Sequence, residues 1–162
     1  MAPASDQYAT LEQSLAWARR MMERAPDEVL GVGSPRGEYL RRWYLTPRNP
    51  HMNTYLHEII RSDDERVMHD HPWDNASLII AGSYREHTPH GSYTRRPGDF
   101  VQRQAVDLHR LELIGDAPVI SLFTTGEKVR EWGFAALQGW VHWREYHIAH
   151  GQLAPAVEGA GA

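Results

Sequence analysis

The 162-residue chain contains no cysteine, so it can form no disulfide bond and offers no thiolate as a nucleophile or metal ligand. Any metal ion must therefore be bound by histidine, carboxylate or amide groups. The sequence also lacks an apolar run long enough to cross a membrane, and its first residues, MAPASDQYATLEQ, lack the basic and apolar regions of a secretory signal. These absences predict a cytoplasmic protein with no membrane partner.

An excess of basic residues is missing as well. The sequence has 17 Lys and Arg against 21 Asp and Glu, a net charge of −4, so no nucleic-acid partner is expected. The length favours a single domain that buries roughly two-thirds of its unfolded surface. We predict a helical segment at 1–28, a β-domain at 29–150 and a flexible, Ala- and Gly-rich tail at 151–162. The sequence is compatible with a homodimer.

Two histidines one residue apart are the strongest chemical signal. His69 and His71 lie in the stretch VMHDHPWDNASLIIAG, ahead of an apolar run at 77–81. Side chains alternate along an extended chain, so both imidazoles point to one side and Asp70 points to the other. Two imidazoles on one side can share a metal ion. The alternative is a pair of surface histidines beside a proline turn.

Periodic apolar patterns predict one helix followed by short strands. Thr10 and Gln13 fit a capping box at the start of a helix at 10–24, and its Leu and Met stripe indicates packing against a sheet. An exposed hairpin is expected within 84–94, and the aromatic stretch 139–147 is expected to pack outside the sheet. Further strands are predicted at 39–45, 52–61, 77–81, 100–103, 108–113, 119–124 and 129–134. Short strands separated by Gly and Pro turns are typical of an all-β sandwich or barrel.

Two of these strands carry candidates for a pocket. In the strand at 52–61, Tyr55 and His57 share a face with other polar groups, which is typical of a cavity wall. Arg41 and Arg42 lie on opposite faces of their strand, so one of them can look inward and bind a carboxylate or phosphate. The alternatives are a hydrogen-bonded structural histidine and a solvated edge arginine.

The spacing of these residues resembles the cupin superfamily, small β-barrels that bind a metal through the histidines of two motifs. The first motif runs Gly, five residues, His-x-His, three or four residues, Glu, six residues, Gly; the matching positions are Asp63, His69, His71, Asn75 and Gly82. The second runs Gly, five residues, Pro-x-Gly, two residues, His, three residues, Asn; the matching positions are Gly98, Gln104, Val106, His109 and Leu113. Three histidines and two glycines fall in register, while Asn75 replaces the usual Glu.

The resemblance implies an all-β fold, a single cupin β-barrel (a double-stranded β-helix of the jelly-roll type) with one N-terminal α-helix packed on it. Local phrases are similar to those of small bacterial and phage cupins, many of which have no assigned reaction. The resemblance also implies that His69, His71 and His109 bind a divalent metal ion. Asn75 would be a weak fourth ligand through its amide oxygen.

A three-histidine site resembles those of thiol dioxygenases and diketone-cleaving cupins. It implies a non-haem Fe(II) oxygenase of a small organic acid or thiol. In that scheme His57, Tyr55 and Tyr84 are candidates for the catalytic acid, base or orienting group, and Arg42 and Arg61 for pairing with a substrate carboxylate. Two alternatives stay open: a Zn, Ni or Mn cupin that is an isomerase or lyase, and a non-catalytic metal- or ligand-binding module.

Overall fold

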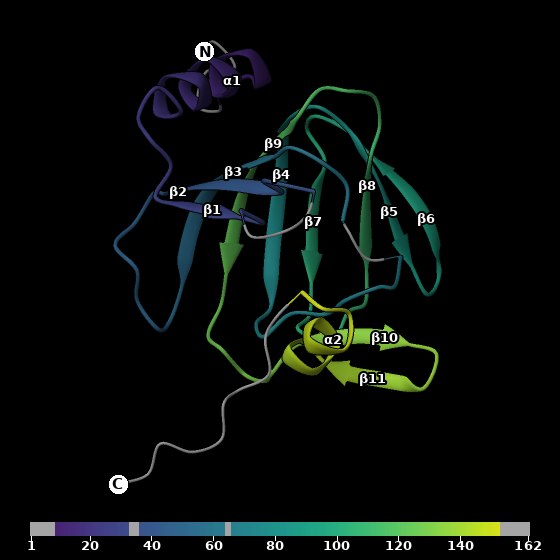
Figure 1. The fold of residues 1–162 in the computed structure, drawn as a ribbon. Coiled ribbons are helices and arrows are strands. Elements are labelled where there is room, and N and C mark those ends of the chain that lie inside the picture. Colours follow the sequence, from purple (N-terminus) through teal and green to yellow (C-terminus); the bar gives the residue numbers. More distant parts are fainter. Residues whose placement is uncertain (1–8, 33–35, 64–65, 153–162) are drawn as a thin grey trace, which may run out of the picture.

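The computed structural model describes residues 9–32, 36–63 and 66–152, which form two β-sheets, a separate hairpin and two helices (Figure 1). The larger sheet has the order β1-β2-β3-β9-β4-β7, the smaller one β6-β5-β8, and β10 pairs with β11. The strands are β1 (Glu28–Leu30), β2 (Leu40–Tyr44), β3 (Asn53–Ile59), β4 (Asn75–Ala81), β5 (Tyr84–Thr88), β6 (Gly91–Arg95), β7 (Phe100–Arg103), β8 (Arg110–Leu113), β9 (Val119–Thr125), β10 (Gly133–Ala136) and β11 (Gly139–His142), and the helices are α1 (Leu11–Met21) and α2 (Trp143–Ala149). The prediction of an all-β fold with an N-terminal helix is confirmed.

The inner core lies between the two sheets. It is built from apolar side chains of both, namely Leu40, Ile59, Ile79, Tyr84, Leu111 and Val119. Burying each such side chain stabilises the fold by about 1.5–3 kcal/mol. The sheets face one another in a jelly-roll arrangement and are not closed into one continuous barrel. Because strand residues alternate, β3 directs His57 and Ile59 toward this interior and Leu56 toward the opposite face.

Helix α1 covers the outer face of the larger sheet, where it contacts β4, and it lies at the top of Figure 1. Ala18 packs there against Trp43, Leu56 and other apolar residues of the sheet. The predicted capping box is present, because the Thr10 hydroxyl accepts from the Gln13 amide while the Gln13 side chain accepts from the Thr10 amide.

The backbone conformation explains why glycine is found at the two motif positions where the sequence keeps it. Gly82, between β4 and β5, has φ +73°, and a Cβ there would lie 2.5 Å from the carbonyl oxygen of Pro118. Gly98, before β7, has φ +95°. A side chain is disfavoured in both backbone conformations, so both turns depend on glycine.

The C-terminal part differs most from the sequence-based expectation. The strand predicted at 129–134 is wrong: β10 spans Gly133–Ala136, and the amides of Val129 and Arg130 instead donate to the carbonyl of Pro72. The stretch 139–147 forms β11 and most of α2, which lie together at one end of the sheets in Figure 1. This stretch contains no long apolar run, so apolar periodicity gave little indication of its secondary structure.

Several expectations concern residues beyond those described. Residues 1–8 of the predicted helical segment, 33–35 and 64–65 of the predicted β-domain and 153–162 of the predicted tail lie outside the described residues. Among the helices that the structure describes, none is long and apolar enough to span a membrane.

Candidate metal centre

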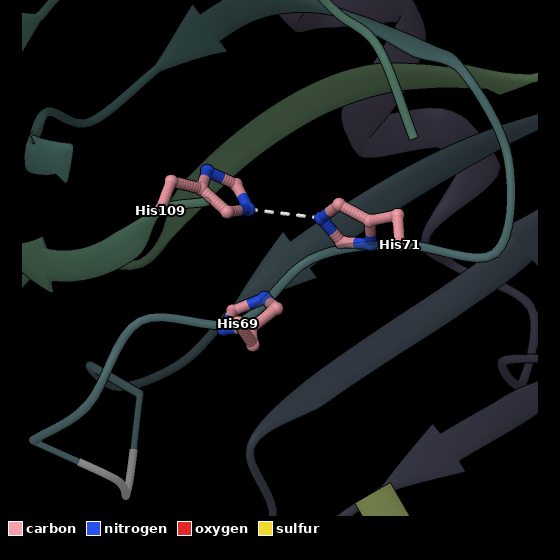
Figure 2. A group of neighbouring side chains, drawn as sticks. All are labelled: His69, His71 and His109. Atoms are coloured by element: carbon pink, nitrogen blue, oxygen red, sulfur yellow. Dashed lines mark hydrogen bonds between the residues drawn. The ribbon is translucent and has the colours of Figure 1, made fainter. Parts of the chain in front are cut away.

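The side chains of the three histidines of the two motifs lie close together. One ligand nitrogen from each of His69, His71 and His109 lies within 4.8 Å of the others, and Figure 2 shows the three rings pointing toward one another. The Nε2 atoms of His71 and His109 are 2.8 Å apart. A metal ion bound at about 2.1 Å by two imidazoles at right angles holds their nitrogens about 3 Å apart, so this donor set fits such an ion.

Backbone pairing holds two of these histidines together. The amide of His69 donates to the carbonyl of His109 and the amide of His109 donates back to His69, both at 2.9 Å. His69 lies outside the named strands, in an extended segment before β4, and its isolated bridges reach both His109 and Phe134. Within 69–71, which is extended as expected, only His69 forms a β-bridge.

Asp70 points away from the two histidines between which it lies, as alternation predicts. Its carboxylate is 2% exposed and accepts from the Gly133 amide at 2.7 Å and from Trp140 Nε1 at 2.9 Å. It also pairs with Arg130. Asp70 therefore fastens the β10–β11 hairpin to the histidine segment.

The carboxylate of Glu86 fixes the orientation of the His109 ring. Glu86 Oε1 lies 2.9 Å from His109 Nδ1. A carboxylate accepts, so Nδ1 carries the proton and the lone pair of Nε2 faces His71. Such a carboxylate–histidine pair is the usual outer support of a metal-binding imidazole.

Glu86 is 1% exposed and receives further hydrogen bonds from Arg103 Nε at 2.6 Å and Arg95 Nε at 2.7 Å. Burial alone would raise the pKa of its carboxyl group, but the hydrogen bond from His109 and the charge of Arg103 outweigh burial and lower that pKa to about 2. Glu86 is thus an anion that balances two arginines.

Burial also keeps two of the histidines neutral. It lowers the pKa of His71 well below 6.5, and the neighbouring charges of His109, His69 and Arg103 lower it further. Burial lowers the pKa of His109 to about 4, although its hydrogen bond to Glu86 acts in the opposite direction. Neutral imidazoles are the form that binds metal.

The histidines open onto a cavity of about 340 Å³ between the sheets. Its apolar wall includes Leu30, Leu40, Ile59, Leu111, Trp73, Phe123 and Trp132. The charged residues in its lining are Arg42 and Arg103, and no carboxylate lines it among the described residues. A cavity of this character suits a small anionic molecule.

Three of the further candidates from the sequence line this cavity: His57, Arg42 and Tyr84. Arg42 Nε donates to His57 Nε2 at 2.9 Å, and Arg42 Nη1 donates to Glu28 at 2.9 Å. Burial, followed by the charge of Arg42, lowers the pKa of His57 well below 6.5. The Tyr84 hydroxyl lies 3.4 Å from Arg103 Nη2, which donates to it.

The other three candidates, Tyr55, Arg61 and Asn75, are not among the cavity-lining residues. Tyr55 stacks behind His57, with ring centroids 5.7 Å apart. Arg61 donates instead to the carbonyls of Glu38 and Gly37, at 3.0 and 2.9 Å. Substrate binding by Arg61 and catalysis by Tyr55 stay predictions.

Asn75 occupies the position that a glutamate holds in the first motif. Its Oδ1 lies 3.5 Å from Arg103 Nη1, which donates to it, while its Nδ2 is buried without a partner among the described residues. Its role as a fourth ligand stays a prediction.

Sequence reasoning missed Glu86 and Arg103. The available signal was alternation in the predicted hairpin, because Tyr84 and Glu86 share a face and both are buried in β5. The expectation that this hairpin is exposed concealed the inward orientation of Glu86. Arg103 ends a strand whose burial alternates, with Val101 and Arg103 facing inward.

No family model matches the sequence, and no curated protein matches it. Solved structures do match, and they define the structural class: the chain has a double-stranded β-helix fold. A candidate mannose-6-phosphate isomerase from Ralstonia eutropha is 18% identical, with a TM-score of 0.51 over 75% of this chain and 98% of that one. A conserved protein with a double-stranded β-helix domain from Klebsiella pneumoniae is 12% identical, with a TM-score of 0.50 over 82% of this chain and 99% of that one.

The lyase DddQ from Ruegeria pomeroyi, which acts on DMSP, is 17% identical, with a TM-score of 0.46. That match covers 57% of this chain and only 49% of the lyase chain. The fold rests on the two matches with TM-scores of 0.50 and 0.51, and at such low identities the chemistry has to be argued from the site.

Proposed function

We propose that this chain is a metal-dependent enzyme of small organic acids, with Fe(II) as its ion and dioxygen as co-substrate. One observation carries the proposal: three imidazole ligands converge on a cavity lined by two arginines and no carboxylate among the described residues. The neutral ligands leave the charge of a bound ion to be balanced by an anionic substrate.

The residues of the chain would have separate roles in this reaction. His69, His71 and His109 would hold the ion, and a bound Fe(II) supplies open coordination positions where substrate and dioxygen can react. The Nη2 atom of Arg42 has no hydrogen-bond partner among the described residues, and in this proposal it would bind the substrate carboxylate. The aromatic and aliphatic wall excludes water from the bound substrate.

A second candidate keeps the site and changes the ion. Three histidines are also the donor set of catalytic zinc centres, and so the same residues can support isomerase or lyase chemistry by a Zn, Ni or Mn Lewis acid without oxygen. A non-catalytic ligand-binding module is the third reading. Turnover under anaerobic conditions separates the oxygenase from the Lewis-acid enzyme, and absence of turnover with every ion favours the module.

The first experiment is metal analysis of protein purified without chelator, together with His69→Ala, His71→Ala and His109→Ala. We expect one bound ion per chain in the native protein and loss of that ion in each variant. His90→Ala is the matched control, because His90 is exposed in the β5–β6 turn. Stoichiometric metal in all three site variants would overturn the proposal.

The second experiment measures oxygen uptake by the Fe(II)-loaded protein with small carboxylic and thiol acids. Uptake that depends on both the acid and the ion supports the oxygenase. Product formation without dioxygen supports the Lewis-acid enzyme instead.

A further inference from the structure

A row of polar side chains crosses the inner face of the larger sheet. Arg42 on β2 lies opposite His57 on β3, and His57 lies opposite Ser121 on β9. Ser77 on β4 is adjacent, since it pairs with Phe123, two residues beyond Ser121 on the same face of β9. All four line the cavity, and together we call them the polar row.

The polar row has unused hydrogen-bonding capacity. Ser77 is 6% exposed and Ser121 is 2% exposed, yet neither hydroxyl has a hydrogen-bond partner among the described residues. Arg42 uses Nε and Nη1 in its contacts with His57 and Glu28, which leaves Nη2.

The free donor of His57 follows from its contact with Arg42. Because Arg42 Nε donates to His57 Nε2, that nitrogen is unprotonated and Nδ1 of the neutral ring carries the proton. Nδ1 has no partner among the described residues. The ring is held between Phe123, at a centroid distance of 4.8 Å, and Tyr55, at 5.7 Å, so its orientation is fixed.

Such unpaired groups discriminate between ligands. A hydrocarbon chain placed against the polar row would displace water and leave the hydroxyls unpaired, which weakens binding. Oxygen atoms of a ligand would pair with them, and a thiol would do so less well because sulfur is a weak hydrogen-bonding group. The polar row therefore favours a ligand with several oxygen atoms.

We propose that the polar row recognises a hydroxylated carboxylate. The carboxylate binds Arg42 Nη2 and His57 Nδ1, and hydroxyl groups bind Ser121 and Ser77. Neighbouring strands lie about 4.8 Å apart, so the row suits a chain of about four carbons. This inference rests on the proposed function in that it names the substrate class of the same site, and it excludes plain thiol acids.

The test compares four ligands of matched length: threonate, butanoate, threitol and 4-mercaptobutanoate. Dissociation constants are measured by NMR titration of the full chain. We expect threonate to bind at least about tenfold more tightly than each of the others, because each of them lacks the carboxylate or the hydroxyl groups. Equal or tighter binding of butanoate or 4-mercaptobutanoate would overturn the inference.

Variants assign the two ends of the ligand. Arg42→Gln should weaken threonate and butanoate binding by about 10–100-fold. The double variant Ser77→Ala with Ser121→Ala should reduce the preference for threonate over butanoate to near unity. Unchanged preference in the double variant would refute the assigned role of the serines.

Matched controls come from outside the cavity. Arg41→Gln removes an arginine whose partners Glu38 and Glu58 lie outside the cavity lining, and Ser83→Ala removes a hydroxyl of the turn after β4. Both should bind threonate as the native chain does. Circular dichroism of each variant reports folding, so a binding loss in a folded protein is attributable to the site.

The titrations are repeated on protein stripped with a chelator and on protein loaded with zinc. The preference for threonate belongs to the sheet and should persist without metal. If the metal analysis fails while this preference remains, the proposed function falls and the assignment of the polar row stands. If metal binds but the preference for threonate is absent, the proposed function stands and the assignment of the polar row falls.

Discussion

Replacement of Glu86 by glutamine tests the outer support of the metal centre. The carboxylate accepts from His109, Arg95 and Arg103, and Glu86→Gln keeps its size but removes the charge. The side chain of Arg103 is 5% exposed, so the variant leaves its charge buried and uncompensated. Breaking a buried pair in this way costs about 3–5 kcal/mol of unfolding free energy.

The same variant should weaken metal binding. Without the carboxylate on Nδ1, the His109 ring loses its fixed tautomer and part of its basicity, and substitutions of this kind reduce metal affinity by about 10–100-fold. Urea unfolding of the metal-free protein measures the first effect, and competition with a chromophoric chelator measures the second.

Glu112→Gln is the matched control, since Glu112 on β8 pairs with His87 on β5 and with Arg110 while its side chain is 43% exposed. We expect a loss below about 1 kcal/mol and no change in metal affinity. Equal destabilisation by the two substitutions, or unchanged metal affinity in the Glu86 variant, would refute the assigned role of Glu86.

Three further predictions concern stability. Burial lowers the pKa of His57 in the folded state, so as the pH falls the unfolded chain binds this proton first. The free energy of unfolding should therefore fall below about pH 6.5, by about 1.4 kcal/mol per pH unit. His57→Gln should remove this part of the pH dependence in urea melts at pH 7.5 and 5.5, and the same pH dependence in both proteins would contradict the prediction. Gly82→Ala should cost about 2 kcal/mol or more, against about 1 for Gly115→Ala, which has positive φ but open space around it. Asp70→Asn should cost about 2 kcal/mol because its three donors lose a charged acceptor, and a smaller loss than for Gly115→Ala would contradict that assignment.

The elements with strong local signals were predictable from the sequence. The capping box of Thr10 marks the start of α1, and β7 was predicted with its observed bounds, because alternation and turn residues are local properties. The register of His69, His71 and His109 rested on motif spacing, and their ligand nitrogens do converge.

Contacts between distant segments were not predictable in the same way. The inward side chain of Glu86 contradicts the usual exposure of glutamate, and only the positions of Arg95, Arg103 and His109 explain its burial. Likewise, Asp70 has three partners that lie 60 to 70 residues later in the chain. A single sequence carries no local trace of such partners.

The reciprocal amide–carbonyl pair between His69 and His109 has one more consequence. The spacing of the two imidazoles is set by main-chain atoms, which no substitution other than proline removes. Exchange of one imidazole for a carboxylate would therefore change the preferred element and its charge while the scaffold keeps its shape. In such a scaffold, single amino-acid replacements at the proposed ligand positions would change the preferred ion.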